Sequence, residues 1–238
     1  VVMAYDTKDH VLFSADAFGR FGGLGYGEEY WDTEGRRYYT NIVGKYGSQV
    51  QNLLKKIGGT QIDMIASLHG PVLSKNLDHY FRLYNLWSTY TPELPEGVLV
   101  AYASIYGGTA AAALNAAELI GMKGVEVATV DLCRQDASIA IAQAFRMGRM
   151  LLASVTYDAS LFPAMNNFLY RLASKGLSGR RVALIENGTW APVAAKLMRD
   201  RLSAMKDMEI VETTLTIRSR LHDADRPQLD ALIAALTA

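Results

Sequence analysis

A short segment near the middle of the chain has the residue types of an anion-binding turn. Ser104-Ile105-Tyr106-Gly107-Gly108-Thr109 lies between an apolar run that predicts a strand and an alanine-rich run that predicts a helix. Glycine lets the backbone approach a phosphate, hydroxyls can donate to it, and a helix N-terminus adds unpaired N–H groups and the positive end of a dipole. We therefore expect an anion here. The spacing is neither a Walker A loop nor the G-x-G-x-x-G fingerprint, and taken alone it also fits an ordinary strand-to-helix turn.

Two later segments place hydroxyl and aromatic residues at the ends of predicted strands. Ser154-Val155-Thr156-Tyr157-Asp158 follows one strand, and Glu186-Asn187-Gly188-Thr189-Trp190 follows the next. In a doubly wound parallel sheet such loops meet beyond the carboxyl ends of the strands, where ligands bind. Tyr106, Tyr157 and Trp190 would then surround one site and could stack on a planar ring system. Each of these aromatic residues, taken alone, also fits packing in the core or at its rim.

Asp16 and His69 are the residues of the first part of the chain that could bind a metal ion. Each is expected directly after a strand, where loops present ligands, and a carboxylate with an imidazole suits iron or zinc. Taken alone, such an aspartate more often caps a loop, and a histidine before Gly-Pro more often lies in a turn. Two ligands do not make a dinuclear site, and His10, His79 and His222 lie in no ligand-spacing pattern.

The elements that would position the anion-binding turn alternate regularly along the second part of the chain. Apolar, β-branched runs predict strands, and runs with apolar residues at helical spacing predict helices. The expected strands are 98–103, 125–130, 150–155, 181–185 and 209–216, and the expected helices are 109–121, 137–149, 163–174, 192–205 and 225–238. Strict alternation of strand and helix predicts an α/β fold with a parallel sheet covered on both faces.

The first ninety residues follow a different pattern. The expected elements are a hairpin of 1–4 and 10–14, helices at 39–57 and 77–90, and a short strand at 64–67. Residues 17–30, rich in glycine and aromatic side chains, predict a long irregular loop, and such loops are often functional. We expect too few strands here to close a core. Thr91–Gly97 contains two prolines and a glycine and predicts a linker.

The composition excludes several classes of protein. The 238 residues are 50% hydrophobic and 20% charged, which fits neither a disordered chain nor a membrane protein. Basic and acidic residues number 24 each, so no net field attracts nucleic acid or an anionic membrane. The single cysteine, Cys133, excludes an internal disulfide and has no neighbouring histidine that would make it a nucleophile. The chain starts at Val1 without an initiator Met or a signal-peptide pattern, so we expect a cytoplasmic protein that is part of a longer one.

Taken together, these segments resemble the flavodiiron proteins, also called A-type flavoproteins. The family's phosphate loop, Ser-x-Tyr-Gly-x-Thr, and its Ser-Pro-Thr-Tyr-Asn loop before Phe-Pro are matched by Ser104, Tyr106, Gly107, Thr109, Ser154, Thr156, Tyr157, Phe162 and Pro163. The departures are Val155 for proline and Asp158 for asparagine, and a carboxylate near a flavin ring would disfavour the reduced, anionic flavin. In the third loop Trp190 stands one position later than the family's tryptophan, so the resemblance carries over the loop rather than the role of Trp190.

The resemblance extends into the first part of the chain. The segment Leu12–Gly19 is similar to the one whose aspartate bridges two irons in the family, and Ser67–Pro71 is similar to the one whose histidine binds one of them. Tyr84-x-x-Trp87 resembles the helix that follows. The family also has a His-x-Glu-x-Asp-His cluster and a further histidine before the bridging aspartate, and nothing ahead of Asp16 matches these. The resemblance thus implies that Asp16 and His69 are iron ligands of a diiron site that this chain alone leaves incomplete.

The resemblance implies a domain organisation and a set of cofactor contacts. Residues 1–96 would be the carboxyl-terminal part of a metallo-β-lactamase-like αββα domain, and residues 97–238 a flavodoxin-like domain with five strands in the order 2-1-3-4-5. FMN would be bound by the three loops, through Ser104, Ile105, Tyr106, Gly107, Gly108, Thr109, Ser154, Thr156, Tyr157, Asp158, Asn187, Gly188, Thr189 and Trp190.

The function implied by the resemblance is that of an oxidoreductase in which FMN relays electrons to a diiron centre that reduces nitric oxide or oxygen. The expected partners are an electron-donor protein, such as a rubredoxin or a flavin reductase, and a second copy of the chain in a head-to-tail homodimer, with no nucleic acid and no membrane. Two alternatives stay open at this point. One is an FMN-carrying electron shuttle with a vestigial metal half, and the other is a hydrolase of the metallo-β-lactamase type, which leaves the flavin loops unexplained.

Overall fold

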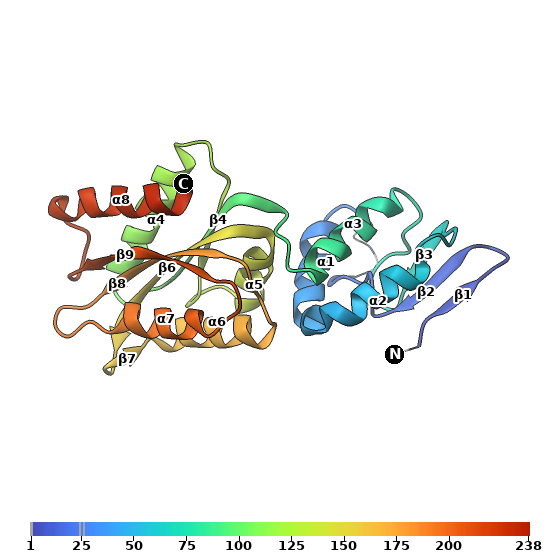
Figure 1. Cartoon of the computed structure of the whole chain (residues 1–238), viewed down its shortest axis with the longest axis horizontal. Coiled ribbons are helices and arrows are strands. Elements are labelled where there is room, and N and C mark those ends of the chain that lie inside the picture. Colours follow the sequence, from blue (N-terminus) through green and yellow to red (C-terminus); the bar gives the residue numbers. More distant parts are fainter. Residues whose placement is uncertain (1, 24, 26) are drawn as a thin grey trace. The chain divides into compact units, whose positions relative to one another are not determined.

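The computed structural model describes residues 2–23, 25 and 27–238. Val1, Leu24 and Tyr26, which fall in the predicted hairpin and loop, lie outside the described residues. The chain divides into two compact units, Val1–Thr91 and Pro92–Ala238, whose elements are labelled in Figure 1. In the part of the chain that the structure describes, no helix has both the length and the apolar character that crossing a membrane requires.

The second unit is built around a parallel sheet. Its main strands are β4 (Leu94–Ala103), β5 (Val127–Asp131), β6 (Met147–Tyr157), β8 (Arg181–Asn187) and β9 (Glu209–Ile217). They pair in parallel in the spatial order β5-β4-β6-β8-β9, which is 2-1-3-4-5 in sequence order. The predicted doubly wound, flavodoxin-like sheet is therefore confirmed. A short strand, β7 (Ser160–Leu161), pairs antiparallel with the end of β6 and is not predicted by the sequence pattern.

Helices cover both faces of this sheet, as Figure 1 shows. On one face lie α4 (Gly108–Gly121) and α8 (Arg226–Thr237), and on the other lie α5 (Ala137–Arg146), α6 (Pro163–Ser174) and α7 (Ala194–Ser203). Alternate residues of β4, among them Val98 and Val100, join the apolar cluster with α4 and α8. Their neighbours Leu99 and Ala101 are equally buried. Burial on both faces explains why the strands are continuous apolar runs.

Helix α5 ends at Arg146, earlier than the predicted residue 149, because a buried arginine caps it. The guanidinium of Arg180, 1% exposed, donates from Nε to the carbonyl of Ala144 (3.0 Å) and from Nη2 to that of Phe145 (3.1 Å). A cation that satisfies the last carbonyls stabilises the end of a helix. Burial lowers the pKa of Arg180 to about 10. The cap comes from a residue distant in the sequence, so local spacing gives no sign of it.

The segment Thr91–Gly97, predicted as a linker, is partly strand. β4 begins at Leu94 and pairs there with the start of β6, with a shift in register before the regular ladder. Such an irregularity accommodates Pro95, which has no backbone N–H to donate. A Cβ on Gly148 of β6 would lie 2.0 Å from the carbonyl oxygen of Pro95, so only glycine permits this close approach. The linker prediction is wrong for Leu94–Gly97.

The first unit combines a three-stranded sheet with helices. β1 (Ala4–Asp6) and β2 (Val11–Ala15) form an antiparallel hairpin, as predicted, but its first strand lies at residues 4–6 instead of 1–4. β3 (Met64–Ser67) pairs in parallel with β2. The helical elements are α1 (Trp31–Tyr38), a π-helical turn (Tyr39–Val43), a 3-10 turn (Gly44–Tyr46), α2 (Gly47–Ile57) and α3 (Leu77–Ser88). The prediction of one helix over 39–57 and of loop up to residue 30 misses α1. Its buried face is Trp31, Gly35, Arg36 and Tyr38, and the glycine and the charge hide the helical pattern.

Aromatic side chains form the core of the first unit. Trp31 of α1 stacks on Trp87 of α3, with ring centroids 5.8 Å apart, and Phe18 contacts Tyr84 with centroids 4.2 Å apart. All four side chains are at most 2% exposed. Large rings bury enough apolar area to build a core from few residues. The expectation that this part could not close a core for want of strands is therefore wrong, because its helices supply the core.

We predict that the first unit loses stability above a pH of about 10. Burial raises the pKa of Tyr38 and of Tyr80 to about 12, and it raises the pKa of Tyr84 as well. An unfolded tyrosine ionises near pH ~10, so the stability is fully present below that value and is lost as the pH rises through the folded-state pKa values. Urea unfolding should show this loss. Tryptophan fluorescence of a Trp190→Phe variant reports on this unit, because the other two of the three tryptophans lie in it.

The matched variant is Tyr84→Phe, which keeps the ring and removes the ionisable hydroxyl. That hydroxyl accepts a hydrogen bond from the backbone N–H of Phe18 at 2.5 Å. The variant should therefore cost about 1 kcal/mol at neutral pH, yet lose less stability than the parent above a pH of about 10. A urea midpoint of the parent that stays constant from pH ~9 to pH ~11 would contradict the prediction.

Candidate functional site

The structure brings the three predicted segments together at the carboxyl edge of the parallel sheet. The prediction that the second and third are loops is wrong for residues 154–157 and 186–187, because these residues are the last of β6 and β8. Ala103, the last residue of β4, pairs with Ser154 of β6. Ser154 pairs in turn with Glu186 of β8, and the next pair along is Val155 and Asn187. The residues that follow β4, β6 and β8 are therefore neighbours across the sheet. This is the edge at which doubly wound sheets bind ligands.

The turn between β4 and α4 uses its two glycines for different purposes. Gly107 has φ +92°, which is costly for residues with a side chain, and its N–H donates to the hydroxyl of Ser104 at 3.1 Å. A Cβ on Gly108 would lie 1.9 Å from the carbonyl oxygen of Ser219, so glycine allows the loop after β9 to touch the start of α4. The first N–H groups of α4 have no acceptor within the helix. The turn therefore offers backbone donors at one point, as an anion requires.

The side-chain amide of Asn187 holds this turn in place. Its Nδ2 donates to the hydroxyl of Thr109 (3.1 Å) and to the carbonyl of Ser219 (3.0 Å), and its Oδ1 accepts from the N–H of Ser219 (2.9 Å). Asn187 is 7% exposed and Thr109 2%. In this arrangement Asn187 positions the anion-binding turn through its neighbours. The Thr109 hydroxyl accepts from Asn187 and so keeps its own hydrogen to donate.

Two polar groups, the half-buried hydroxyl of Thr156 and the buried carboxylate of Glu186, fix the loop that carries Trp190. The hydroxyl of Thr156 accepts from the N–H groups of Val193 (2.9 Å) and Ala194 (3.1 Å), at the start of α7. The carboxylate of Glu186, 7% exposed, accepts from the N–H of Ala195 at 2.8 Å. Both groups supply acceptors to the N-terminus of α7, where donors are unpaired and negative charge is favourable. Thr156, predicted as a cofactor contact, thus also shapes the loop 188–192.

The aromatic side chains at this edge face solvent. Tyr106 is 97% exposed, Trp190 84% and Tyr157 43%, so the alternative of packing in the core does not describe them. The ring of Tyr157 meets that of Phe162 edge-on, with centroids 5.4 Å apart. Exposed rings of this size, held on loops with fixed ends, are available for stacking on a planar ligand.

The remaining predicted contacts lie beside these rings in different settings. Asp158 and Ala159 have φ +48° and +52° and form the two-residue turn between β6 and β7, a conformation that aspartate and asparagine tolerate better than most residues. Asp158 therefore serves the turn at the position where the family has asparagine. The hydroxyl of Ser154 is buried and donates to the carbonyl of Val155 at 3.3 Å, whereas Ile105 and Thr189 are exposed.

Two arginines near the turn are not predicted from the sequence. Arg218 and Arg220 are exposed and flank Ser219, whose backbone contacts Gly108 and Asn187. Their positive charges lie on the loop that touches the anion-binding turn, where they favour an anion. Only the strand order and the Asn187 hydrogen bonds bring the loop after β9 to α4, so the Arg-Ser-Arg sequence alone gives no signal.

Cys133 lies near the same edge, in the loop after β5. Partial burial raises the pKa of its thiol, an effect that a hydrogen bond with the backbone of Ser104 partly offsets. A raised pKa disfavours the thiolate, which is the nucleophilic form.

The two predicted metal ligands lie together in the first unit. His69 Nε2 and Asp16 Oδ1 are 3.3 Å apart, and the hydroxyl of Tyr38 donates to the same Asp16 oxygen at 3.4 Å. Two ligands that share one ion at about 2.1 Å each lie about 3 Å apart, so the pair could hold one ion. Over residues 2–23, 25 and 27–238 no three His, Cys, Asp or Glu side chains gather into a metal-binding group. A dinuclear metal site would therefore need ligands other than the side chains of these described residues.

The sheet order and the turn at the end of its first strand define the second unit as a flavodoxin-like domain. No family model matches the chain. The chain is 27% identical over 241 residues to the anaerobic nitric oxide reductase flavorubredoxin of Salmonella arizonae, an alignment that covers 97% of this chain and 48% of the relative.

Solved structures give the same result. The rubredoxin:oxygen oxidoreductase of Desulfovibrio gigas matches with a TM-score of 0.88 at 18% identity, over 99% of this chain and 60% of that one. The flavodiiron protein of Giardia intestinalis matches with a TM-score of 0.85 at 20% identity, over 99% of this chain and 59% of that one. The chain thus resembles the flavodiiron proteins over almost its whole length, and it spans about half the length of the curated relatives it matches.

We predict that Gly108→Ala disrupts the anion-binding turn and that Gly121→Ala, in the same helix, does not. The new Cβ at position 108 would meet the backbone of Ser219, which has to move, so we expect a loss of about 1–3 kcal/mol in the free energy of unfolding. At Gly121 no other described segment lies within 4 Å of the added Cβ, and alanine should be neutral or stabilise the helix by up to about 1 kcal/mol. Chemical unfolding followed by circular dichroism measures both. Equal stabilities of the two variants would refute the close contact.

Proposed function

We propose that this chain is the flavin-binding part of a flavodiiron-type oxidoreductase. The second unit, Pro92–Ala238, would form its FMN-binding domain, and the first unit, Val1–Thr91, part of its metallo-β-lactamase-like domain, because the expected boundary between residues 96 and 97 falls inside β4. One observation carries the proposal: three loops meet at one edge of a flavodoxin-like sheet, where an anion-binding turn lies beside exposed aromatic rings. That combination fits a ligand with a phosphate at one end and a flat ring system at the other. The resemblance to proteins named as oxidoreductases gives independent support.

Different residues at the carboxyl edge of the sheet would bind the phosphate and the ring system of FMN. The backbone of residues 104–109, with the hydroxyls of Ser104 and Thr109, would hold the phosphate, and Arg218 and Arg220 would balance its charge. Tyr106, Tyr157 and Trp190 would cover the ring system. FMN bound in this way can take up and pass on one or two electrons. The chain's part is to fix the flavin and exclude water from its faces.

The activity of the whole protein is a further step of the proposal. Its substrate would be nitric oxide or oxygen, reduced at a diiron centre, with electrons from a donor protein such as a rubredoxin or a flavin reductase. Asp16 and His69 would supply one carboxylate and one imidazole to that centre. Its other ligands would come from outside the described residues, so we derive no step through the iron. A head-to-tail homodimer in the cytoplasm is the expected setting.

A second candidate is an FMN-carrying electron-transfer module without catalysis of its own. The observation that favours it is the pairing of Asp16 and His69 without a third metal ligand among the residues that the structure describes. A hydrolase of the metallo-β-lactamase type is less well supported, because it leaves the exposed aromatic edge of the second unit without a role.

We predict that the purified chain binds FMN, and that two variants separate the phosphate from the ring. Trp190→Ala should weaken FMN and riboflavin equally, by about 1 kcal/mol or about fivefold in Kd, because it removes stacking alone. Gly108→Ala should weaken FMN and leave riboflavin, which lacks the phosphate, almost unchanged. Quenching of flavin fluorescence measures both affinities.

The matched control for the stacking variant is Tyr170→Ala, which removes an exposed ring of α6 and should leave both affinities unchanged. The proposal fails if the chain binds neither flavin, or if Tyr170→Ala weakens FMN as much as Trp190→Ala does.

We also predict that the chain alone retains fewer than two irons after anaerobic reconstitution and dialysis, measured by elemental analysis. Asp16→Ala should lower the iron content further and leave FMN affinity unchanged, because the two sites lie in separate units. Two tightly held irons per chain would contradict the two-ligand geometry. If Asp16→Ala also leaves the rate of flavin reduction by a chemical donor unchanged, the electron-transfer module accounts for the chain as it stands.

A further inference from the structure

Arg20, in the loop that follows β2, is a buried cation with unused hydrogen-bond donors. The residue is 3% exposed. Its Nε and Nη2 are buried and have no hydrogen-bond acceptor among residues 2–23, 25 and 27–238. Burying a charge without hydrogen bonds is costly, and such groups call for a partner. Arg180 shows the usual solution in this chain, since its buried guanidinium donates to backbone carbonyls.

The two unused nitrogens define the chemistry of the missing partner. Nε and Nη2 share one edge of the guanidinium plane and present two nearly parallel N–H bonds. That edge matches the two oxygens of a carboxylate or of a larger oxyanion, which it binds in a bidentate way. A neutral ligand or a cation would not use it.

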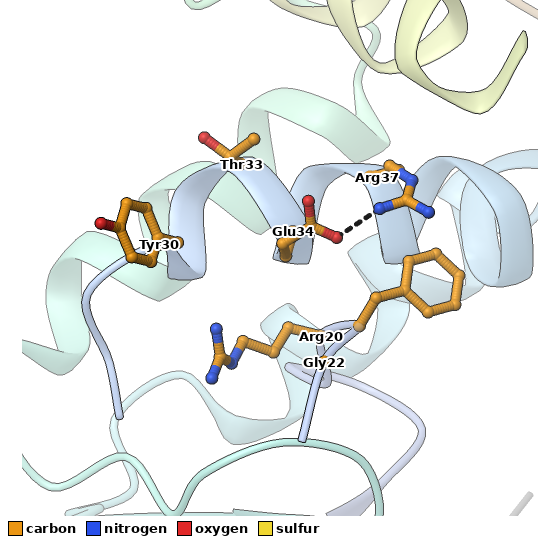
Figure 2. A pocket seen from close by; sticks show the side chains of 7 residues that line it. Arg20, Gly22, Tyr30, Thr33, Glu34 and Arg37 are labelled. Atoms are coloured by element: carbon orange, nitrogen blue, oxygen red, sulfur yellow. Dashed lines mark hydrogen bonds and ion pairs between the residues drawn. The ribbon is translucent and has the colours of Figure 1, made fainter. Parts of the chain in front are cut away.

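Arg20 lines two cavities, which leave room for such a ligand. One, of about 510 Å³, lies against α1 and is also lined by Tyr30, Thr33 and Glu34. Figure 2 shows the Arg20 side chain extending beside α1, with Tyr30 just before the start of the helix and the Thr33 side chain on the side of the helix that faces away from Arg20. The other, of about 520 Å³, is lined by Asp16 and His69.

The acidic side chains of the cavity walls already have partners. Glu34 forms an ion pair with Arg37 at 2.6 Å, drawn as a dashed line in Figure 2. Asp16 contacts His69 and accepts from Tyr38, as described above. Neither Glu34 nor Asp16 therefore neutralises the positive charge of Arg20, and the electrostatic field of that charge in the cavity favours an anion.

The backbone holds Arg20 in place. Its N–H donates to the carbonyl of His69 at 3.0 Å, and Gly70, at φ +109°, lies so close that an added Cβ would be 2.9 Å from Cγ of Arg20. A fixed side chain loses little entropy when a ligand binds. The same hydrogen bond ties Arg20 to the loop that carries one of the two candidate metal ligands.

We propose that Arg20 binds a small oxyanion of the carboxylate type in the cavity beside α1, next to the Asp16 and His69 pair. The site needs neither flavin nor iron, so it stands apart from the proposed function. Bound there, the anion would neutralise the buried guanidinium and stabilise the first unit.

Acetate is the probe, because its planar carboxylate fits the Nε and Nη2 edge and it does not compete as phosphate would at residues 104–109. The test follows the arginine Nε–H resonances of the full chain by NMR during titration with sodium acetate, with sodium chloride at equal ionic strength as the salt control. We expect one resonance to shift saturably with acetate alone. That resonance should be missing in Arg20→Gln and present in Arg82→Gln, a control variant that removes a charge of α3 outside both cavities.

Thermal unfolding gives a second readout. Acetate should raise the melting temperature of the parent and of Arg82→Gln, and not that of Arg20→Gln. If Arg20→Gln does not fold, Arg20→Lys keeps the charge but lacks the two parallel donors, and it should bind acetate at least about tenfold more weakly. Chloride that reproduces the shift of the Arg20 resonance, or acetate that binds Arg20→Lys as tightly as the parent, would overturn the proposal.

Discussion

The hydrogen bonds of one side-chain amide determine the geometry of the candidate flavin site. Asn187 ends β8 and uses its donors and its acceptor on Thr109 at the start of α4 and on Ser219 after β9. Buried amide hydrogen bonds are strong in a low-dielectric setting and costly to break, so these contacts fix loops that the strands alone would leave free. Gly108 completes the arrangement, because a side chain there would push the loop after β9 away. Asn187 and Gly108 together thus preorganise the turn between β4 and α4.

A similar principle operates in the first unit, where aromatic packing does the positioning. Phe18 lies in the loop between the candidate ligand Asp16 and the buried Arg20, and its N–H is held by the hydroxyl of Tyr84. Its ring packs on that of Tyr84 in the core. The loop therefore has its central residue anchored, while its polar side chains line the two cavities. Rigid support beneath a site of this kind keeps ligand atoms within reach of one another.

The sequence is sufficient to predict the sheet of the second unit, because each strand is a continuous apolar run and each helix has a clear spacing. It fails where the deciding contact is distant. The end of α5 depends on Arg180, and the π-helical turn after α1 belongs to a helix whose buried face includes Gly35 and Arg36.

The candidate flavin site likewise has some features that the sequence predicts and others that depend on contacts between distant segments. The loop residues could be named from their types, and the structure places them at one edge. The positioning role of Asn187, the neighbouring arginines and the burial of Arg20 depend on which segments meet in space. No local pattern carries that information. The aromatic core of the first unit was hidden for a related reason, since its rings come from several helices and a loop.

The contact between Pro95 and Gly148 also bears on how the second unit can be isolated. A fragment cut at residue 97, where composition suggests a boundary, would lose the start of β4 and the backbone on which β6 packs. In such a fragment the stretch of β6 at Met147 would lose its pairing partner Leu94. Its exposed backbone N–H and C=O groups could then pair with a strand of another molecule. The natural place to divide the chain is before Pro92, so that the proline-containing segment stays with the sheet it completes.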